Sequence, residues 1–415
     1  MPDRLRVIVG AYACSPLRGS ECGVGWGWVR SLARFHDLWV LTGSEYRPEI
    51  ESELKHDPDL GRSLRFQYIP HRRLRLIERV WDPTFLVTYA NQWQRDAYRA
   101  ALRLHAEHRF HLAHQLTYVG FRVPGHLWKL GVPFVWGPIG GLEQTPWALL
   151  GAMGWRGACV YAARNVWNEF DRRWAPLPRA AFRQAAALIA ATRGIQSEIR
   201  RFYHRESEVI SEIGEPPVSF SDISRRHQGE PLRLLWSGLH LPGKALPVLL
   251  RALAQTGDGV DWRLTVLGAG PLTPAWKREC HRLGLAARCN WLGQVKREEA
   301  VLQMRSAHVL AVSSLHDLTS TVVVEALCSA LPVICPDLYG FRDAVTEECG
   351  FRVPATSVGA LQAGMARSIV ALHDDESLRR RMAAAALDRS RSYAWSWKAD
   401  LVNTIYHTAL QGRSC

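Results

Sequence analysis

The sequence predicts an α/β protein with two Rossmann-like halves, each built on a parallel sheet. Short apolar runs such as residues 5–11 and 232–236 alternate with stretches of helical periodicity, as buried parallel strands and their crossover helices do. Residues 215–231 are polar and contain three prolines, which is the composition of an interdomain linker. The alternation begins again at Leu232, so we expect one half before the linker and one after it.

The composition is that of a soluble globular chain. It has 415 residues, of which 47% are hydrophobic, and this length suits two domains or one large one. No apolar run is long enough to span a membrane and the first residues show no signal-peptide pattern, so we expect a cytoplasmic protein. The nine cysteines include no CxxC pair, which favours reduced thiols over disulfides or a zinc site.

The net charge of +13 is compatible with nucleic acid, a membrane surface or an anionic substrate as partner. Arginines are spread along the chain and no DNA- or RNA-binding motif is present, so we expect no nucleic-acid partner. Residues 71–81 alternate basic and apolar side chains and are a candidate for peripheral contact with the inner face of a membrane. An exposed arginine-rich face explains the same pattern.

The first half has strand patterns at 5–11, 38–41, 64–69, 111–115, 133–136, 185–191 and 208–213, and helical patterns at 24–35, within 81–108 and in a Trp- and Arg-rich insertion at 147–183. In the loop after the first strand, Gly19 and Ser20 allow a phosphate to approach the backbone, and Glu21 can face a ligand. No GxGxxG follows the strand, so this is not a dinucleotide-binding turn.

Two later loops of the first half also end strands with polar or small residues. His114 and Tyr118 belong to a polar cluster at the carboxyl end of a strand, where α/β sheets bind ligands. A hydrogen-bonded core histidine is the alternative for His114. Gly140 and Gly141 follow the next strand and permit close approach of a ligand to the backbone, although a structural turn explains them equally well.

The second half has strand patterns at 232–236, 262–267, 309–312 and 332–335, and helical patterns at 245–255, from 296, from 321, at 360–387 and up to 410. Lys244 lies in the loop after the first of these strands and places a mobile cation where a diphosphate could bind; a surface lysine is the alternative. Gly268 begins another loop that permits close backbone approach.

Residues 309–340 follow the order strand, polar loop, helix, strand, and residues 319–321 lie at the helix start, where free N–H groups can bind a phosphate. Asp317 precedes the helix and Glu325 lies inside it, with seven residues between them. Glu325 is not a capping residue, because its partner in a capping box would be Val322. The alternative is that Asp317 caps a turn and Glu325 is solvated.

This block resembles the motif of retaining glycosyltransferases of family 4, the group 1 glycosyltransferases, in which an acidic residue is followed by seven residues and a Glu. The resemblance covers almost the whole chain, and GSECGVGW at residues 19–26 resembles a subgroup of the family. It implies the GT-B fold, in which two facing Rossmann-like domains enclose a cleft. The implied parts are an acceptor-side domain at 1–214, the linker at 215–231, a donor-side domain at 232–390 and a closing helix at 391–415 that crosses back to the first domain.

The resemblance also implies roles for individual residues. Catalytic roles fall on His114, Lys244 and Asp317, donor binding on Gly19, Ser20, Gly268, Val295, Thr319, Ser320, Thr321 and Glu325, and acceptor binding on Glu21, Tyr118, Gly140 and Gly141. The chain departs from the family at two positions, because Asp317 stands where Glu is commoner and Leu239 stands where Arg is usual. His240 or Arg193 could supply the missing cation.

The function that the resemblance implies is transfer of a sugar from a nucleotide-diphosphate sugar, with UDP or GDP as the nucleotide, to an acceptor hydroxyl. The acceptor is a small molecule, a lipid-linked compound or a glycan, and the mechanism is a retaining, same-face transfer that needs no metal and no other cofactor. A sugar-nucleotide epimerase, a coupling enzyme of pseudo-glycosyltransferase type and a non-catalytic nucleotide-sugar-binding protein are the alternatives.

Overall fold

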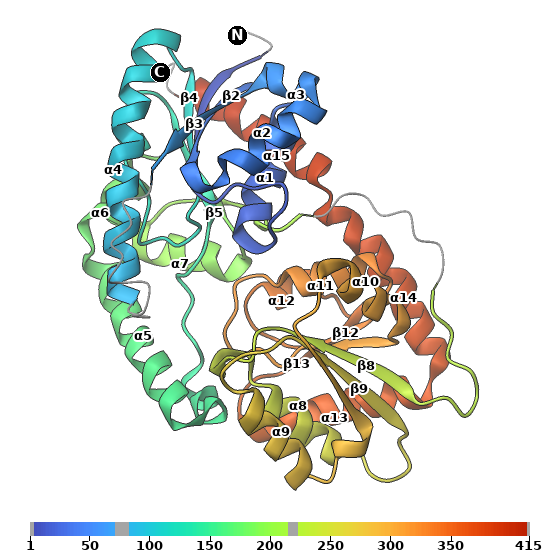
Figure 1. Ribbon diagram of the computed structural model, residues 1–415. Helices are drawn as coiled ribbons and strands as arrows, with labels where there is room; N and C mark the ends of the chain where they lie inside the picture. The colour runs from blue at the N-terminus through green and yellow to red at the C-terminus, as the bar shows by residue number, and fades with distance from the viewer. Residues whose placement is uncertain (1–3, 71–82, 215–222, 413–415) are drawn as a thin grey trace. The chain divides into compact units, whose positions relative to one another are not determined.

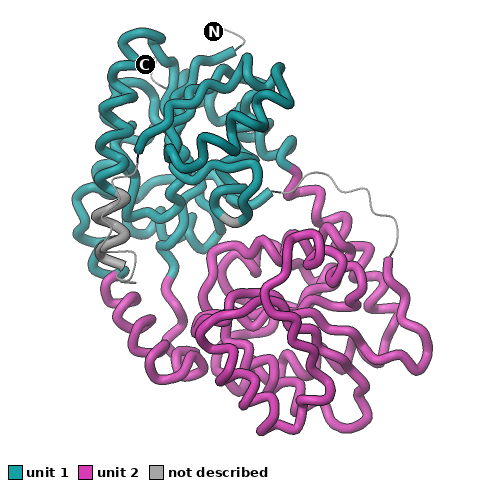
Figure 2. Tube along the Cα trace, in the orientation of Figure 1, with its two compact units in different colours: residues 1–143, 168–214, 395–415 teal, residues 144–167, 215–394 magenta. Residues whose placement is uncertain are grey.

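A computed structural model describes residues 4–70, 83–214 and 223–412. The chain forms two compact units (Figure 2). Unit 1 comprises residues 1–143, 168–214 and 395–415, and unit 2 comprises residues 144–167 and 215–394. The segment at 71–81, for which membrane contact was expected, lies outside the described residues.

Unit 1 contains a seven-stranded sheet in the order β3-β2-β1-β4-β5-β6-β7, and every ladder in it is parallel. Its strands are β1 (Arg6–Ala11), β2 (Asp37–Gly43), β3 (Leu64–Ile69), β4 (Leu112–Thr117), β5 (Phe134–Ile139), β6 (Ala187–Ala190) and β7 (Glu208–Val209). The central strands are buried on both faces, which explains why they read as continuous apolar runs rather than as alternating patterns.

The helices of unit 1 are α1 (Ser20–Leu32), α2 (Arg47–His56), α3 (Pro58–Ser63), α4 (Pro83–His108), α6 (Pro176–Gln184), α7 (Arg193–Tyr203) and α15 (Trp395–Gln411). Helix α15 follows unit 2 in the chain but packs in unit 1 beside α1. The ring of Trp395 meets that of Trp28 edge-on at a centroid distance of 5.5 Å, and the Lys398 ammonium donates to the carbonyl of Ser211 at 2.6 Å. These contacts fix the last helix to the first unit.

Unit 2 contains a six-stranded, fully parallel sheet in the order β10-β9-β8-β11-β12-β13. Its strands are β8 (Leu232–Ser237), β9 (Trp262–Leu267), β10 (Cys289–Gly293), β11 (Val309–Ala311), β12 (Val333–Pro336) and β13 (Gly350–Val353). Its helices are α8 (Leu246–Ala254), α9 (Thr273–Arg282), α10 (Arg297–Ser306), α11 (Thr321–Cys328), α12 (Tyr339–Ala344), α13 (Val358–Asp374) and α14 (Glu376–Ser390). Helices α8, α9 and α13 cover one face of the sheet, and α10, α11, α12 and α14 cover the other (Figure 1).

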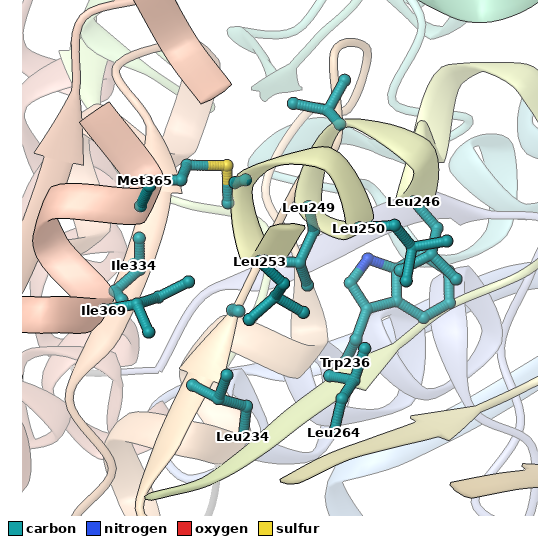
Figure 3. Close-up of a cluster of buried hydrophobic side chains, with 14 of the residues drawn as sticks. Leu234, Trp236, Leu246, Leu249, Leu250, Leu253, Leu264, Ile334, Met365 and Ile369 are labelled. Carbon is teal, nitrogen blue, oxygen red and sulfur yellow. The ribbon is translucent and has the colours of Figure 1, made fainter. Parts of the chain in front are cut away.

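The core of unit 2 lies between its sheet and helix α8. Four leucines of α8 point toward Trp236 and toward side chains of β8, β9 and α13 (Figure 3). Leu249 and Leu250 are fully buried there, and each such side chain stabilises the fold by about 1.5–3 kcal/mol. This packing holds the loop that connects β8 to α8 against the end of the sheet.

Residues 144–167 belong to unit 2, although the sequence assigned them to the first domain. They contain a short 3₁₀ helix, Trp147–Met153, from which Leu149, Leu150 and Met153 enter the core of unit 2. Helix α5 (Gly154–Trp174) follows, and it begins in unit 2 and ends in unit 1 (Figure 2). An apolar pattern shows that a segment is buried, but it does not show which core the segment joins. The insertion was therefore predicted in the wrong domain.

The stretch at 360–387 also differs from expectation. It forms two helices, α13 and α14, because Asp375 stands between them with an extended backbone and accepts a hydrogen bond from the Leu378 amide at 2.8 Å. Asp375 is therefore the N-cap of a new helix. The short elements α12 and β13 were not predicted, since their apolar runs are only a few residues long.

Candidate functional site

The centre of the unit 2 sheet is a topological switch point. The chain leaves β8 toward β9 on one side, and β11 lies on the other side. Loops that leave such a pair of strands diverge, and α/β proteins bind ligands at this point. Lys244 lies in the loop after β8 and Asp317 in the loop after β11, and the Lys244 ammonium donates to a carboxylate oxygen of Asp317. Two of the three predicted catalytic residues are thus brought together.

The two loops are also joined through their backbones. The carbonyl of Gly243 accepts from the amide of Leu315 at 2.8 Å. The Ser313 hydroxyl donates to the carbonyl of Lys244 at 2.9 Å and accepts from the Trp236 indole N–H, also at 2.9 Å. These hydrogen bonds hold together the loops that carry Lys244 and Asp317. The entropic cost of ordering the ion pair around a ligand is therefore lower.

Gly268 holds a third loop against the first. Its φ is +101°, and a Cβ at this position would stand 2.0 Å from the carbonyl oxygen of Gly238. The amide of Gly268 also donates to the carbonyl of Gly293 at 2.7 Å. The close approach expected at Gly268 is therefore made to neighbouring loops of the protein, and donor contact through this glycine stays a prediction.

Helix α11 begins beside this loop cluster. Ser320 is its N-cap residue, Thr321 its first residue, and no side chain caps it. Thr319, just before the helix, is largely buried. It packs closely against Gly340, because a Cβ added to Gly340 would come within 2.3 Å of the Thr319 methyl carbon. The three residues lie where the sequence placed them, and an uncapped helix start is suited to an anion.

Glu325 lies on α11, with 15% of its side chain exposed. Its carboxylate is 3.3 Å from the guanidinium of Arg297, the first residue of α10. Val295 is in the loop just before α10. The alternative of a solvated Glu325 does not fit this burial, and Glu325 and Val295, both predicted to bind the donor, lie on or next to neighbouring helices.

His316, to which the sequence did not point, lies in the loop after β11. Its Nδ1 is 2.9 Å from the Thr145 hydroxyl, and its ring lies 5.0 Å from the Tyr161 ring and 5.7 Å from the Tyr339 ring, measured between centroids. Thr145 and Tyr161 come from the insertion at 144–167. The signal that could have found His316 is its position directly before Asp317.

The imidazole of His316 is neutral at physiological pH. Burial, together with the nearby cations of Arg164 and Lys244, lowers the pKa of His316 to about 3. A neutral ring beside the Lys244–Asp317 pair adds no charge to the site. It can position that pair and shield it from water.

The cation expected to replace the missing Arg is not His240. The His240 side chain is fully buried, its Nδ1 lies 2.7 Å from the Thr273 hydroxyl, and burial lowers its pKa. Leu239, at the position of the usual Arg, is 55% exposed. Arg193 begins α7 in unit 1. The expectation for His240 was wrong, because a buried neutral imidazole cannot neutralise a phosphate.

Unit 1 has its own switch point between β1 and β4. Tyr12 follows β1 and Tyr118 follows β4, and their rings are stacked with a centroid distance of 4.6 Å. The carboxylate of Glu21 accepts from the amide of Val119 at 3.2 Å, and burial raises the pKa of Glu21. Two of the predicted acceptor residues, Glu21 and Tyr118, thus lie at one end of the sheet.

Several buried polar atoms of unit 1 have no hydrogen-bond partner among the residues described. Four of them are Glu45 Oε2, Asn91 Oδ1, Gln94 Nε2 and Gln115 Oε1. The Tyr12 hydroxyl donates to the other oxygen of Glu45 at 2.8 Å, which links Glu45 to the stacked tyrosines. Unsatisfied buried polar atoms are costly, so they point to a ligand or to water. The sequence did not point to these residues, because they come from separate elements.

His114 lies within β4, inside unit 1. It is fully buried; its Nε2 donates to the carbonyl of Gly137 at 2.8 Å, and its Nδ1 lies 2.7 Å from the Tyr406 hydroxyl of α15. Burial lowers the pKa of His114 to about 4. Both ring nitrogens are thus engaged within unit 1, which favours the core-histidine alternative, and a catalytic role of His114 stays a prediction.

The glycines predicted for unit 1 have different surroundings. The amide of Gly140 donates to the carbonyl of Val119 at 2.7 Å, so the structural-turn interpretation fits Gly140. Gly141 adopts a φ of +83° next to it. Gly19 is the N-cap of α1, which begins at Ser20, and no atom lies within 4 Å of the position of a Cβ on Gly19.

Within the described ranges, no group of three or more His, Cys, Asp or Glu side chains is placed to hold a metal ion. The eight cysteines that the structure describes are all unbridged.

Comparison with known sequences finds a family match in the second half of the chain. Residues 221–389 match the family described as "Glycosyl transferases group 1". A D-inositol 3-phosphate glycosyltransferase of Corynebacterium glutamicum (strain R) is 30% identical over 201 residues, which cover 46% of this chain and 47% of the relative. A phosphatidyl-myo-inositol mannosyltransferase of Mycobacterium leprae (strain TN) is 32% identical over 170 residues, covering 40% and 44%. The chain thus matches about half the length of these curated relatives.

Solved structures share the fold over almost the whole chain. A sucrose-phosphate synthase of Thermosynechococcus elongatus aligns with a TM-score of 0.70 and 17% identity, covering 99% of this chain and 100% of the other. The HepE protein of Anabaena, in complex with UDP, aligns with a TM-score of 0.61 and 14% identity, covering 97% and 100%. At these identities the likeness concerns the fold alone.

Proposed function

Because residues 221–389 form a group 1 glycosyl transferase domain and the chain has the GT-B fold, we propose that this protein transfers a sugar from a nucleotide-diphosphate sugar to an acceptor hydroxyl. The observation that carries the proposal is the pairing of Lys244 with Asp317 at the switch point of unit 2, beside the start of α11. A cation, a carboxylate and a helix N-terminus together match the diphosphate and the hydroxyls of such a donor.

Lys244 and the first amides of α11 bind the diphosphate in this proposal, and Asp317 accepts a hydrogen bond from a hydroxyl of the sugar. Glu325 binds the ribose, with Arg297 holding its carboxylate. As the bond between the anomeric carbon and the diphosphate breaks, negative charge grows on the diphosphate, and Lys244 stabilises it. This cation is the reason why we propose a reaction that needs no metal.

The transfer proceeds with retention in this proposal. The acceptor oxygen attacks the anomeric carbon from the face that the diphosphate leaves. The hydroxyl proton passes to an oxygen of the departing diphosphate, so no protein base is required. This step rests on the resemblance of the 317–325 block to family 4 enzymes, and it needs no proton transfer by His114, whose two ring nitrogens are hydrogen-bonded within unit 1.

The acceptor we propose is a ring that carries several hydroxyl groups. The aromatic faces of Tyr12 and Tyr118 and the unpaired polar atoms of Glu45 and Gln115 suit such a molecule. Two similar proteins are named for inositol-containing compounds, which are hydroxylated rings of this kind. UDP is our first choice of nucleotide, since the similar HepE structure contains it.

A thermal-shift panel with UDP, GDP, ADP and dTDP, followed by a transfer assay, tests the proposal. A nucleotide at a hundred times its dissociation constant stabilises its site by roughly 2.7 kcal/mol. We expect one nucleotide to raise the melting temperature and its sugar conjugate to be consumed when an acceptor is present. A donor that is epimerised without an acceptor would indicate an epimerase, and binding without turnover across hydroxylated acceptors would indicate a non-catalytic protein.

A further inference from the structure

Helix α5 exposes an apolar face to solvent. We call this set the outer face of α5: Trp155, Cys159, Val160, Ala163, Val166, Trp167, Phe170 and Trp174, all of which are exposed. The opposite side of the same helix carries Gly157, Asn165 and Asn168, which are buried. The inward side thus packs the helix against the rest of the described chain, and the apolar side chains on the other side face solvent with most of their surface.

The exposed area is large. Trp155 is 74% exposed, Trp167 55%, Phe170 62% and Trp174 68%. Since an aromatic side chain offers roughly 150–250 Å², these four rings leave on the order of 500 Å² of apolar surface uncovered. Apolar patches of this size on a monomer usually mark a binding surface.

The charges around the outer face are positive. Arg156 lies over the ring of Trp155 with its guanidinium 5.1 Å from the ring centroid, and Arg164 and Arg173 are also exposed. The helix carries two acids, and both form ion pairs: Glu169 with Arg172 and Arg173, and Asp171 with Arg122. Four arginines against two acids leave α5 with a charge of +2.

We propose that the outer face of α5 lies on the surface of an anionic phospholipid membrane. Trp and Phe rings insert at the boundary between headgroups and acyl chains, and flanking arginines bind lipid phosphates. The helix does not cross the bilayer in this proposal, because its charged residues and its buried inner side forbid it. No helix in the described part of the chain is both long and apolar enough for that.

A membrane fits this surface better than a second copy of the chain. Two copies that met through the outer face would bring Arg156 and Arg164 of one copy near those of the other, and this repulsion opposes assembly. An anionic surface turns the same charges into attraction.

The inner side of α5 borders the candidate donor site. A Cβ on Gly157 would come within 2.7 Å of Pro242, and a Cβ on Gly243 within 2.5 Å of the Tyr161 hydroxyl. The helix that contacts the membrane is therefore the one that supports the Lys244 loop. The inference itself does not depend on the proposed transferase activity, since binding to vesicles can be measured without turnover.

Flotation of the full-length protein with vesicles tests the proposal. The probes are phosphatidylcholine vesicles with and without phosphatidylglycerol. We expect the protein to float with the anionic vesicles, to stay unbound with neutral ones and to dissociate at high salt. Replacing Trp155, Trp167, Phe170 and Trp174 with Ser together should lower the vesicle partition coefficient by about tenfold or more, and Arg156→Glu should lower it for anionic vesicles.

Trp397→Ser is the matched control, because Trp397 is 47% exposed but belongs to a different helix, α15. It should bind vesicles like the wild type, and thermal melts verify that all variants fold. Failure of the wild type to float with anionic vesicles would overturn the proposal. So would equal binding by the four-residue variant, or a concentration-dependent dimer in sedimentation that this variant abolishes, because a second copy would then cover the face. Loss of transfer with intact flotation would instead count against the proposed function alone.

Discussion

At the scale of single residues, the Lys244–Asp317 pair defines the charge of the candidate donor site. Its members come from loops that are 73 positions apart and meet only because β8 and β11 are neighbours. The sequence predicted both residues, since each follows a strand whose carboxyl end is identifiable. It did not predict their mutual contact or the position of His316 beside them.

Lys244→Met should lower kcat by roughly 10²–10³-fold, because it removes a positive charge that stabilises the leaving diphosphate. The substitution also leaves the Asp317 carboxylate without its cation. The double variant Lys244→Met/Asp317→Asn separates the two effects, since it removes the uncompensated negative charge as well. Steady-state kinetics measure both, with Lys277→Met on the exposed side of α9 as the control. Unchanged kcat in the single variant would exclude Lys244 from the reaction.

Glu325→Gln should raise the KM for the donor about ten- to hundredfold and leave kcat nearly unchanged. A hydrogen bond to a charged group contributes roughly 1.5–3 kcal/mol, and the ribose contact is the same in the ground state and the transition state. Donor titrations at saturating acceptor measure this. Glu298→Gln, an exposed residue of the neighbouring α10, should have no effect. A fall in kcat at constant KM would place Glu325 at the reacting bond rather than at the ribose.

Chelation should leave the transfer rate within about twofold of its normal value, since Lys244 supplies the charge that a divalent cation would otherwise provide at the diphosphate. The measurement is the initial rate before and after dialysis against EDTA. Activity that disappears on dialysis and returns with Mg²⁺ or Mn²⁺ would contradict this expectation.

At the scale of elements, the sequence predicted the strands best. The patterns at 64–69 and 262–267 coincide with β3 and β9. Apolar runs bounded by turns are local features, so they can be read without knowledge of the fold. The insertion at 144–167 could not be assigned, because its side chains Leu149 and Met153 belong to a core whose members outside the insertion lie about 80 or more positions later in the chain. The local pattern shows that such side chains are buried but not which distant segment covers them.

Leu249→Ala should lower the free energy of unfolding of unit 2 by about 2–5 kcal/mol. Leu249 is fully buried on α8, between the sheet and α13, where little relaxation can fill the space that its side chain leaves (Figure 3). Leu302→Ala is the control, because Leu302 is 55% exposed on α10 and its change should be close to zero. Chemical denaturation followed by circular dichroism compares the two. If Leu249→Ala changed the free energy of unfolding no more than Leu302→Ala, the core at α8 would contribute little to the stability of the unit.

At the scale of the whole molecule, several histidines are buried in a neutral form. Burial lowers the pKa of His36, His114 and His308 to about 4, and that of His316 to about 3. They belong to both units and lie on different elements. The sequence shows 16 histidines but not which of them fold into apolar surroundings, so this property could be read only from the structure.

The protein should lose stability as the pH falls from 7 to 5. These histidines have folded-state pKa values below the unfolded value of about 6.5, so the unfolded chain takes up protons first. Their contribution is constant above pH 6.5 and is lost as the pH falls toward 4. For His114 alone the loss is about 1.4 kcal/mol for each pH unit in this range, and the net charge of +13 adds repulsion.

Thermal melts between pH 5 and pH 8 measure how stability changes with pH. The His114→Gln variant shows how much of this change is due to His114. The Gln side chain can still bond the Gly137 carbonyl and the Tyr406 hydroxyl but does not titrate. The variant should melt below the wild type at pH 7, because its shape differs, yet its melting temperature should fall less steeply toward pH 5. If the melting temperatures of the two proteins fell equally steeply toward pH 5, His114 would be protonated in the folded state. That result would conflict with its burial between β4, Gly137 and α15.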